Sequence, residues 1–253
     1  MLPSFKVVIP ARYGSNRLPG KPLLDIGGKP MIERVCETAL LTGREVFVAT
    51  DDSRICDAVR HLPVQAIMTN PDHTSGTERI AEVASRLNWQ PDEIIVNLQG
   101  DEPLVDARLI TGLANRLSQQ KLAGIATLAT PILETADLFN PNCVKVALNK
   151  KGYALYFSRA PIPWDREHFP GQTSKINTQK WLRHIGIYAY SAHFLKCYTT
   201  WERSPLETVE SLEQLRILWE GEPVAVLLTD SAPPAGVDTE EDLTRVRSLF
   251  SHH

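Results

Sequence analysis

The stretch that decides the fold is Phe5-Lys-Val-Val-Ile-Pro-Ala-Arg-Tyr-Gly-Ser-Asn-Arg-Leu-Pro-Gly-Lys21. Its apolar run 7–9 is typical of a buried parallel strand, and Pro10 is expected to end that strand because proline lacks a backbone donor. The loop that follows carries three cations, Arg12, Arg17 and Lys21. Guanidinium and ammonium groups suit oxyanions, so we expect this loop either to hold a triphosphate or to be ordinary solvated surface. Its spacing matches neither GxGxxG nor GxxxxGK[ST].

Composition limits the classes of protein to consider. The chain has 253 residues, 43% of them hydrophobic, and a formal net charge of −3. An α/β enzyme is therefore the default expectation, and long-range attraction to nucleic acid or to an anionic membrane is not expected. The N-terminal apolar run is too short for a signal sequence, and no stretch approaches the ~20 apolar residues of a membrane span, so we expect a cytoplasmic protein.

Four cysteines are far apart in the sequence and form no CxxC pair. They are Cys36, Cys56, Cys143 and Cys197. This spacing argues against a zinc site and against a disulfide framework.

Strands and helices alternate through the first half. Strands are expected at 45–50, 64–67, 93–98 and 125–130, and helices at 31–41, 53–60, 77–87 and 106–117. This alternation predicts right-handed crossovers and a doubly wound, mainly parallel sheet.

The pattern changes after Pro131. Segments 144–148 and 153–157 resemble a hairpin, which would make the sheet mixed. Residues 158–180 form a long excursion that is either a lid or an oligomer contact. A strand at 181–190, a helix at 206–219, a strand at 223–228 and a helix at 239–249, capped from Asp238 or Thr239, complete one domain over 1–253.

Ligands of open α/β sheets bind at the carboxyl ends of the strands, which here are followed by loops 11–21, 68–78 and 99–103. A carboxylate beside a cationic phosphate loop suits Mg²⁺, so Asp101 is the first candidate metal ligand. Asp238, in a turn before the last helix, is the second. The alternatives are that Asp101 caps the helix near Asp106 or closes a turn, and that Asp238 is a helix cap.

The loop His73-Thr-Ser-Gly-Thr-Glu-Arg79 places small polar groups around one glycine. It is expected either to recognise a base and ribose or to be an ordinary turn with Thr77 as the helix cap. Arg79 would lie in the first helical turn, where its charge opposes the helix dipole, and this indicates a partner anion.

The second half offers groups that suit an acidic, hydroxylated substrate. Arg159, Arg183 and His184 lie near expected strand ends, and Tyr188 is on the same strand face as His184. The alternative for His184 is a hydrogen-bonded structural histidine. Helical spacing places Glu207, Glu210 and Gln214 on one face, which is either solvated or turned toward the ligand.

Five ordered segments resemble the 3-deoxy-manno-octulosonate (KDO) cytidylyltransferase family. They are residues 8–22 of the cationic loop, 73–79 (HTSGTER), 97–103 (NLQGDEP), 184–190 (HIGIYAY) and 212–216 (LEQLR). The first is shared among sugar nucleotidyltransferases, whereas HTSGTER and NLQGDEP together are far more selective. The resemblance implies the nucleotide-diphosphosugar transferase type of fold, with a smaller β excursion for dimerisation. It also implies a homodimer that forms CMP-KDO and diphosphate from CTP and KDO, ahead of lipopolysaccharide assembly.

The resemblance also implies roles for particular residues. Arg12 and Lys21 would hold the triphosphate, and Asp101 and Asp238 would bind Mg²⁺. Contacts to cytidine would come from Ser75, Arg79 and Gln99, and contacts to KDO from Arg159, His184, Tyr188, Glu210 and Gln214.

Other functions remain open from the sequence. One is a nucleotidyltransferase that uses another nucleotide, another sugar acid or a KDO variant such as the 8-amino sugar. A second is a catalytically silent nucleotide-binding regulator, which would lack a metal carboxylate. A third is a metal-dependent glycosyltransferase, whose DxD-type signature is not obvious here.

Overall fold

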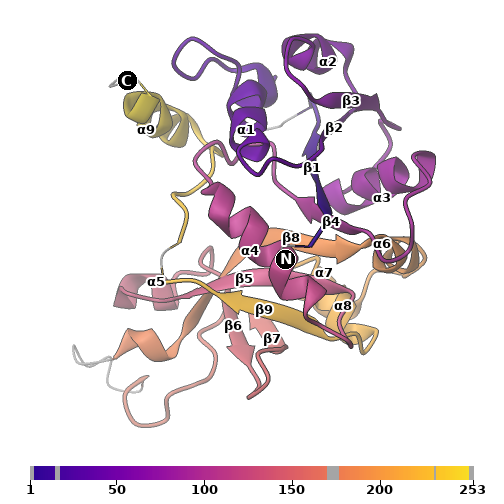
Figure 1. Cartoon of the computed structure of the whole chain (residues 1–253). Helices are drawn as coiled ribbons and strands as arrows, with labels where there is room; N and C mark the ends of the chain where they lie inside the picture. The colour runs from indigo at the N-terminus through magenta and orange to yellow at the C-terminus, as the bar shows by residue number, and fades with distance from the viewer. Residues whose placement is uncertain (1–2, 15–17, 170–176, 231, 251–253) are drawn as a thin grey trace. The chain divides into compact units, whose positions relative to one another are not determined.

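A computed structural model describes residues 3–14, 18–169, 177–230 and 232–250 (Figure 1). The chain divides into two compact units. The first unit comprises residues 1–115, 189–199 and 233–253, and the second comprises 116–188 and 200–232. The expectation of one domain over 1–253 stays a prediction. In the described part of the chain, no helix is both long and apolar enough to cross a lipid bilayer.

The first unit follows the predicted alternation of strands and helices. Its elements are β1 (Phe5–Ala11), η1 (Lys21–Leu23), α1 (Met31–Leu40), β2 (Val46–Thr50), α2 (Ser53–Val59), β3 (Gln65–Met68), α3 (Gly76–Arg86), β4 (Ile94–Asn97), most of α4 (Ala107–Ser118), α6 (Ala192–Tyr198) and α9 (Glu240–Phe250). The strands and helices expected before residue 118 are all present, with bounds that differ by a residue or two. Two short elements of this unit, η1 and α6, were not expected.

Strands β3, β2, β1 and β4 pair in this order, and all three pairs are parallel. The chain moves outward from β1 to β3 and then returns across β1 to β4. Because crossovers are right-handed, this reversal places α3 on the opposite side of β1 and β2 from α1 (Figure 1). The register aligns Ala11 with Thr50 and Thr50 with Met68, so the loops after these strands leave from one edge of the sheet.

Pro10 does not end the first strand, contrary to the prediction. It pairs with Ala49, and β1 continues to Ala11. Val8 uses its carbonyl toward the β4 side, where it accepts from Leu98 N at 3.1 Å. Pro10, two residues later, faces the same side. Because β4 ends opposite Val8, the missing N–H of Pro10 costs no ladder hydrogen bond.

The second unit contains β5 (Ile125–Pro131), α5 (Thr135–Phe139), β6 (Lys145–Leu148), β7 (Ala154–Ser158), η3 (Thr178–Lys180), most of β8 (Leu182–Ser191), α7 (Pro205–Glu210), α8 (Leu215–Trp219) and β9 (Val224–Leu228). Strands β5 and β9 are parallel, whereas β6 pairs antiparallel with β7 and β8. The predicted mixed, mainly parallel sheet and its hairpin are thus confirmed. The helix α5 was not expected, and residues 170–176 of the excursion lie outside the described residues.

The helix predicted over 206–219 is wrong, because the structure has two short helices there. Helix α7 ends at Glu210, and Ser211 adopts a left-handed conformation with φ 52°. Gln214 then precedes α8. A left-handed residue breaks the helical repeat, so Glu207, Glu210 and Gln214 do not share one helix face.

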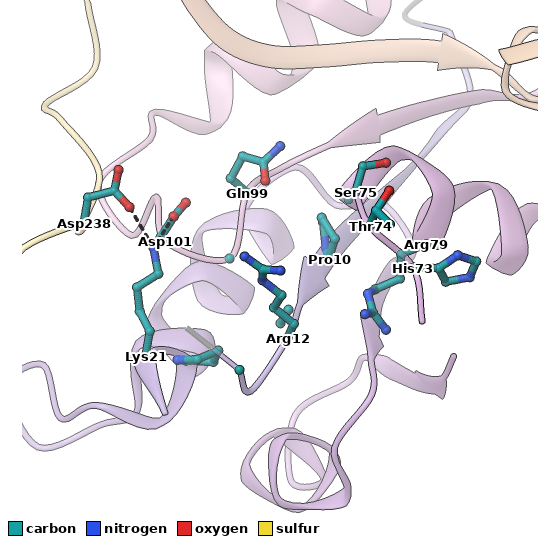
Figure 2. A pocket seen from close by; sticks show the side chains of 15 residues that line it. Pro10, Arg12, Lys21, His73, Thr74, Ser75, Arg79, Gln99, Asp101 and Asp238 are labelled. Carbon is teal, nitrogen blue, oxygen red and sulfur yellow. Dashed lines mark hydrogen bonds and ion pairs between the residues drawn. The ribbon is translucent and has the colours of Figure 1, made fainter. Parts of the chain in front are cut away.

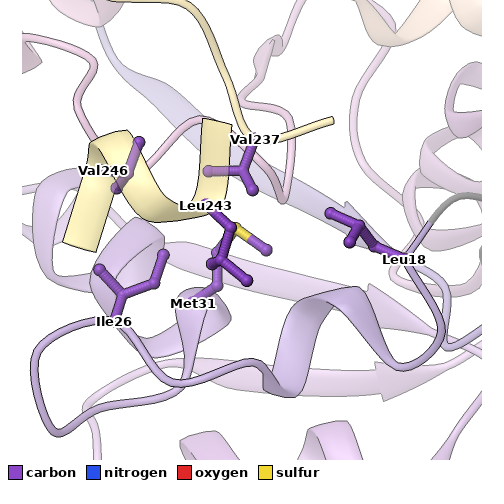
Figure 3. Close-up of a cluster of buried hydrophobic side chains, with 6 residues drawn as sticks. All are labelled: Leu18, Ile26, Met31, Val237, Leu243 and Val246. Atoms are coloured by element: carbon purple, nitrogen blue, oxygen red, sulfur yellow. The ribbon is translucent and has the colours of Figure 1, made fainter. Parts of the chain in front are cut away.

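A cluster of buried apolar side chains joins the last helix to the segment after the cationic loop (Figure 3). It consists of Leu18, Ile26, Met31, Val237, Leu243 and Val246, none more than 2% exposed. Burying side chains of this size contributes roughly 1.5–3 kcal/mol each relative to exposure. The cluster therefore anchors α9 and the residue before Asp238 on the first unit.

Candidate functional site

The site in the first unit is a cavity of about 460 Å³ at the carboxyl ends of the parallel strands. Its lining comes from the cationic loop, the HTSGTER loop, the turn after β4 and the turn before α9: Pro10, Ala11, Arg12, Gly14, Lys21, Pro22, His73, Thr74, Ser75, Gly76, Arg79, Gln99, Gly100, Asp101 and Asp238. We call residues 11–21 the phosphate loop and residues 73–79 the base loop. Seven of the predicted site residues line this one cavity: Arg12, Lys21, Ser75, Arg79, Gln99, Asp101 and Asp238.

Lys21 brings together the two aspartates that are 137 residues apart in the sequence. Its Nζ lies 2.5 Å from Asp101 Oδ2 and 3.0 Å from Asp238 Oδ1. It also donates to the carbonyl oxygen of Val237 at 3.0 Å. In Figure 2 these three charged side chains lie on one side of the cavity, Thr74 and Ser75 lie on the other, and Arg12 lies between them.

Asp238 reaches the cavity because its neighbours take the structural roles. Thr239 and Asp242 form the cap of α9, with Asp242 N donating to Thr239 Oγ1 at 3.2 Å and Thr239 N donating to Asp242 Oδ2 at 3.1 Å. Val237 is buried, and its N–H donates to Asp101 O at 2.9 Å. A Cβ on Gly236 would lie 2.9 Å from the same oxygen, so only glycine allows this close approach. Thr239, the second of the two expected caps, is the residue used.

Asp101 does not cap α4. Asp106 occupies that position, where its Oδ1 accepts from Arg108 N at 2.8 Å. The carboxylate of Asp101, whose side chain is 31% exposed, is instead directed to Lys21. The helix-cap alternative for Asp101 is therefore wrong.

Lys21 remains charged at neutral pH. Burial alone would lower the pKa of Lys21, but the nearby carboxylates of Asp101 and Asp238 outweigh this effect and raise the pKa above its usual value. The ammonium group thus neutralises part of the acidic pair.

The acidic pair suits a divalent cation. Carboxylate oxygens are the ligands that Mg²⁺ prefers, and Mg²⁺ commonly takes one or two of them together with phosphate oxygens and water. Among the described residues, no group of three or more His, Cys, Asp or Glu side chains could hold a metal alone. Asp101 and Asp238 therefore fit a cation that arrives with a nucleotide phosphate.

The base loop caps a helix and lines the cavity at the same time. Ser75 Oγ accepts from Glu78 N at 3.2 Å, so Ser75 is the cap of α3 and the expected Thr77 is not. Thr77 is buried, with its Oγ1 3.5 Å from Tyr190 Oη. Thr74 N donates to Glu78 Oε2 at 2.8 Å. Capping α3 and lining the cavity are therefore compatible in this loop, whereas the expectation that Thr77 is the cap is wrong.

Arg79 has the partner anion that its position in the first helical turn indicated, and that anion is a protein carboxylate. Arg79 Nη2 donates to Asp51 Oδ2 at 3.1 Å, and Nη1 donates to Thr69 Oγ1 at 2.5 Å. The Arg79 side chain is 3% exposed. The sequence analysis did not single out Asp51, because recognising its role requires knowing which strands are neighbours.

Three predicted residues of the nucleotide site remain, and the structure describes two of them, Gln99 and Arg12. Gln99 Nε2 donates to Asn97 Oδ1 at 3.3 Å, which orients its amide beside the cavity. Arg12 is exposed at the cavity. Arg17 lies outside the described residues.

In the second unit, Arg159 and Glu210 are held together. Glu210 accepts from Ser158 Oγ at 2.6 Å and from Arg159 N at 2.9 Å. The Arg159 guanidinium donates to the backbone carbonyls of Glu210, Pro141 and Ser211. Arg159 thus fastens the end of α7, and in this conformation Nε and one N–H of each terminal nitrogen donate to backbone carbonyls.

His184 and Tyr188 lie side by side on β8, with ring centroids 5.6 Å apart. Burial lowers the pKa of His184 to about 3, so its imidazole is neutral at neutral pH. Thr127 Oγ1 lies 3.0 Å from His184 Nε2 and donates to backbone carbonyls of β8.

Gln214 is buried with 6% exposure, and Glu207 forms a buried ion pair. Arg216 Nε and Nη2 donate to the two Glu207 carboxylate oxygens at 2.8 and 2.7 Å. This pair joins α7 to α8 across the left-handed Ser211 and so determines where Glu210 and Gln214 lie. Glu207 is therefore not solvated, and its carboxylate is directed to Arg216.

The four cysteines are free, as expected, with Cys36 and Cys143 buried. Burial raises the pKa of Cys36 to about 12, which keeps it a thiol.

A cationic loop, an acidic pair and a hydroxyl-rich loop at the carboxyl ends of parallel strands define a nucleotide-binding α/β protein. Comparison with known proteins agrees: residues 6–224 match the family model described as Cytidylyltransferase. The chain belongs to the cytidylyltransferase family.

Similar relatives carry the name 3-deoxy-manno-octulosonate cytidylyltransferase, which confirms the resemblance. The protein of Idiomarina loihiensis is 55% identical over 248 residues, which cover 97% of this chain and 98% of the relative. That of Methylococcus capsulatus is 55% identical over 98% of this chain and 97% of the relative. A solved CMP:2-keto-3-deoxy-manno-octonic acid synthetase complexed with CTP has a TM-score of 0.89 and 43% identity, with 99% of each chain covered.

Proposed function

We propose that this chain transfers CMP from CTP to the anomeric hydroxyl of KDO, forming CMP-KDO and diphosphate for lipopolysaccharide biosynthesis. The observation that carries the proposal is the convergence of Lys21 with Asp101 and Asp238 at one end of a cavity whose other end is the base loop. The names of the relatives and the CTP complex of the solved synthetase support CTP and KDO as the substrates.

The nucleotide would occupy the cavity of the first unit. Arg12 and Lys21 would hold the triphosphate and offset the charge that develops as diphosphate leaves. Ser75, Arg79 and Gln99 would position the cytidine, and the short polar side chains of this loop favour the smaller pyrimidine. Because Arg79 is already bound to Asp51, its contribution would come mainly through the position of the base loop.

Asp101 and Asp238 would hold Mg²⁺, which would supply positive charge at the α-phosphate and acidify the attacking hydroxyl. The lysine ammonium now shared by these carboxylates would become available to phosphate oxygens when they bind the cation. No covalent intermediate with a protein side chain is needed, because positioning and charge neutralisation dominate such transfers.

The sugar acid would be positioned by groups of the second unit. The neutral imidazole of His184 would form a hydrogen bond with a sugar hydroxyl, and the Tyr188 phenol lies beside it. Arg159, Glu210 and Gln214 would complete this set. Three of the five Arg159 N–H groups donate to backbone carbonyls, so the two others would make the contact with the KDO carboxylate.

The homodimer implied by the resemblance belongs to the same proposal, and light scattering after size exclusion measures it. The cytoplasmic location stays a prediction.

The direct test is diphosphate release from CTP, KDO and Mg²⁺, with UTP, ATP and GTP and with other sugar acids, including the 8-amino variant, as a panel. We expect CTP with KDO to be the best pair. Release with another nucleotide or sugar acid, and not with this pair, would identify a different nucleotidyltransferase. No release with any pair, while CTP still binds, would favour the regulatory alternative.

A further inference from the structure

We propose that Asp51 is a positioning residue that sets the spacing between the phosphate loop and the base loop. This inference rests on the proposed function, since it concerns how one nucleotide is held by both loops. Among the described residues that line the cavity, Asp51 does not occur. Its action on a ligand would therefore be indirect.

The Asp51 carboxylate contacts both loops at once. Its Oδ1 accepts from Tyr13 N in the phosphate loop at 3.1 Å, and its Oδ2 accepts from Arg79 Nη2 in the base loop at 3.1 Å. The Asp51 side chain is 16% exposed and that of Arg79 is 3% exposed. Solvent screens such a pair poorly, so it differs from a surface ion pair of little energetic effect.

Asp51 itself is fixed by the sheet. It follows Thr50, the last residue of β2, which is in register with Ala11 of β1 and Met68 of β3. Because β2 lies between β1 and β3, Asp51 lies between the strand that leads into the phosphate loop and the strand that leads into the base loop.

On the base-loop side, the planar guanidinium of Arg79 makes a second fixed contact. Its Nη1 donates to Thr69 Oγ1 at 2.5 Å, while Thr69 Oγ1 donates to Thr50 O at 3.0 Å. Arg79 lies one helical turn after Ser75, the α3 cap that lines the cavity. The fork thus ties the N-terminus of α3 to the ends of β2 and β3.

On the phosphate-loop side, the backbone of Tyr13 is held by Asp51, and its side chain reaches Gly20 near the end of the loop. The Arg54 guanidinium lies 3.5 Å from the centroid of the Tyr13 ring, and Asp52 holds Arg54 with an Nη2 to Oδ2 distance of 2.6 Å. At Gly20, where φ is +66°, a Cβ would lie 3.1 Å from Tyr13 Oη. The ring therefore packs on the residue directly before Lys21.

These contacts predict a specific effect on binding. The phosphate loop and the base loop would hold opposite ends of the nucleotide, and preset spacing lets both ends bind without a further ordering cost. We call the contacts of Asp51 with Tyr13 and Arg79 the brace. Weakening the brace should reduce the affinity for CTP by more than the combined losses of affinity for cytidine and for inorganic tripolyphosphate.

The test compares the purified wild-type chain with Asp51→Asn, which keeps the size of the side chain but removes its charge. CTP and tripolyphosphate are titrated by calorimetry and cytidine by NMR. We expect the Kd for CTP to rise about 10- to 100-fold, which corresponds to about 1.4–2.8 kcal/mol. The Kd for each fragment should rise less than about threefold, corresponding to less than about 0.7 kcal/mol. Asp57→Asn, which breaks the exposed ion pair with Arg60, is the matched control and should bind CTP as the wild type does.

Arg79→Lys is the second variant. It keeps the charge but loses the fork between Asp51 and Thr69, so it should show the same pattern with a smaller rise in Kd. A purely structural role would lower the melting temperature and the number of binding sites, and would leave the Kd of the remaining sites unchanged.

Two results would overturn the proposal: an unchanged Kd for CTP in folded Asp51→Asn, or a loss for CTP no larger than the two fragment losses together. Failure of the wild-type chain to bind CTP would instead overturn the proposed function. The same comparison of Kd values for wild type and Asp51→Asn is then made with the nucleotide that does bind.

Discussion

Replacing Lys21 by alanine should have two effects of opposite sign. Without nucleotide, the variant should bind a divalent cation more tightly than the wild type, because the Lys21 ammonium now occupies the carboxylates of Asp101 and Asp238. With nucleotide, the variant should use CTP less well, because the same ammonium would contact the triphosphate.

The size of the first effect follows from the exposure of the two contacts. The Asp101 contact, at 2.5 Å between side chains that are 17% and 31% exposed, is a partly buried charge-assisted hydrogen bond of about 1.5–3 kcal/mol. The Asp238 side chain is 50% exposed, so its contact adds less than about 1 kcal/mol. Removing an interaction of about 2–3 kcal/mol that competes with the cation should tighten cation binding roughly 30- to 150-fold.

Mn²⁺ titration followed by electron paramagnetic resonance measures the first effect, and steady-state diphosphate release measures the second. The KM for CTP should rise at least about tenfold, the loss of about one charge-assisted hydrogen bond, while the KM for KDO changes little. Lys29→Ala removes a lysine that pairs with Glu33 and Glu37 and is absent from the cavity lining, so it is the control. Mn²⁺ affinity that falls or stays equal in Lys21→Ala would refute the competition, and equal losses for CTP and KDO would refute the placement of Lys21 at the triphosphate.

Three further outcomes are expected. Asp101→Asn should lower the turnover of diphosphate release by orders of magnitude while leaving the fold intact, and a folded, fully active variant would remove Asp101 from the mechanism. Burial lowers the pKa of His184 to about 3. Between about pH 3 and about pH 6.5 the imidazole therefore binds a proton only in the unfolded chain. The free energy of unfolding should fall as the pH drops through this range, by up to about 1.4 kcal/mol per pH unit. Urea unfolding at pH 7 and pH 5 measures this, and His184→Gln should lose less stability than the wild type; equal losses would contradict the assignment. Arg216→Met removes both close hydrogen bonds to the buried Glu207 carboxylate and leaves, among the described residues, only the exposed Arg203 at 3.9 Å, which should cost about 3–5 kcal/mol of unfolding free energy. The double replacement with Glu207→Leu should recover most of this loss in the same urea experiment, and no recovery would show that packing rather than charge is responsible.

The amino-acid sequence by itself determined the fold class and most element bounds. The apolar runs at β1, β2 and β4, each followed by a polar or glycine-containing loop, are local patterns that chain neighbours alone specify. The cationic loop and the two aspartates were also visible as residue types that suit phosphate and a divalent cation. Strand order and direction then place the loops at one edge, because right-handed crossovers leave few alternatives.

Tertiary structure alone decided how side chains distant in the sequence are paired. The sequence analysis expected an anion for Arg79 but not Asp51, and a solvated or ligand-facing Glu207 rather than a partner for Arg216, because ion pairs form between residues that folding brings close. Pro10 stays within β1 because its neighbour β4 is short, and Asp238 reaches Lys21 because Val237 is buried against Leu18 and Leu243. Each of these outcomes depends on which side chains are buried and on how far apart the packed elements lie. A local stretch of sequence specifies neither burial nor this spacing.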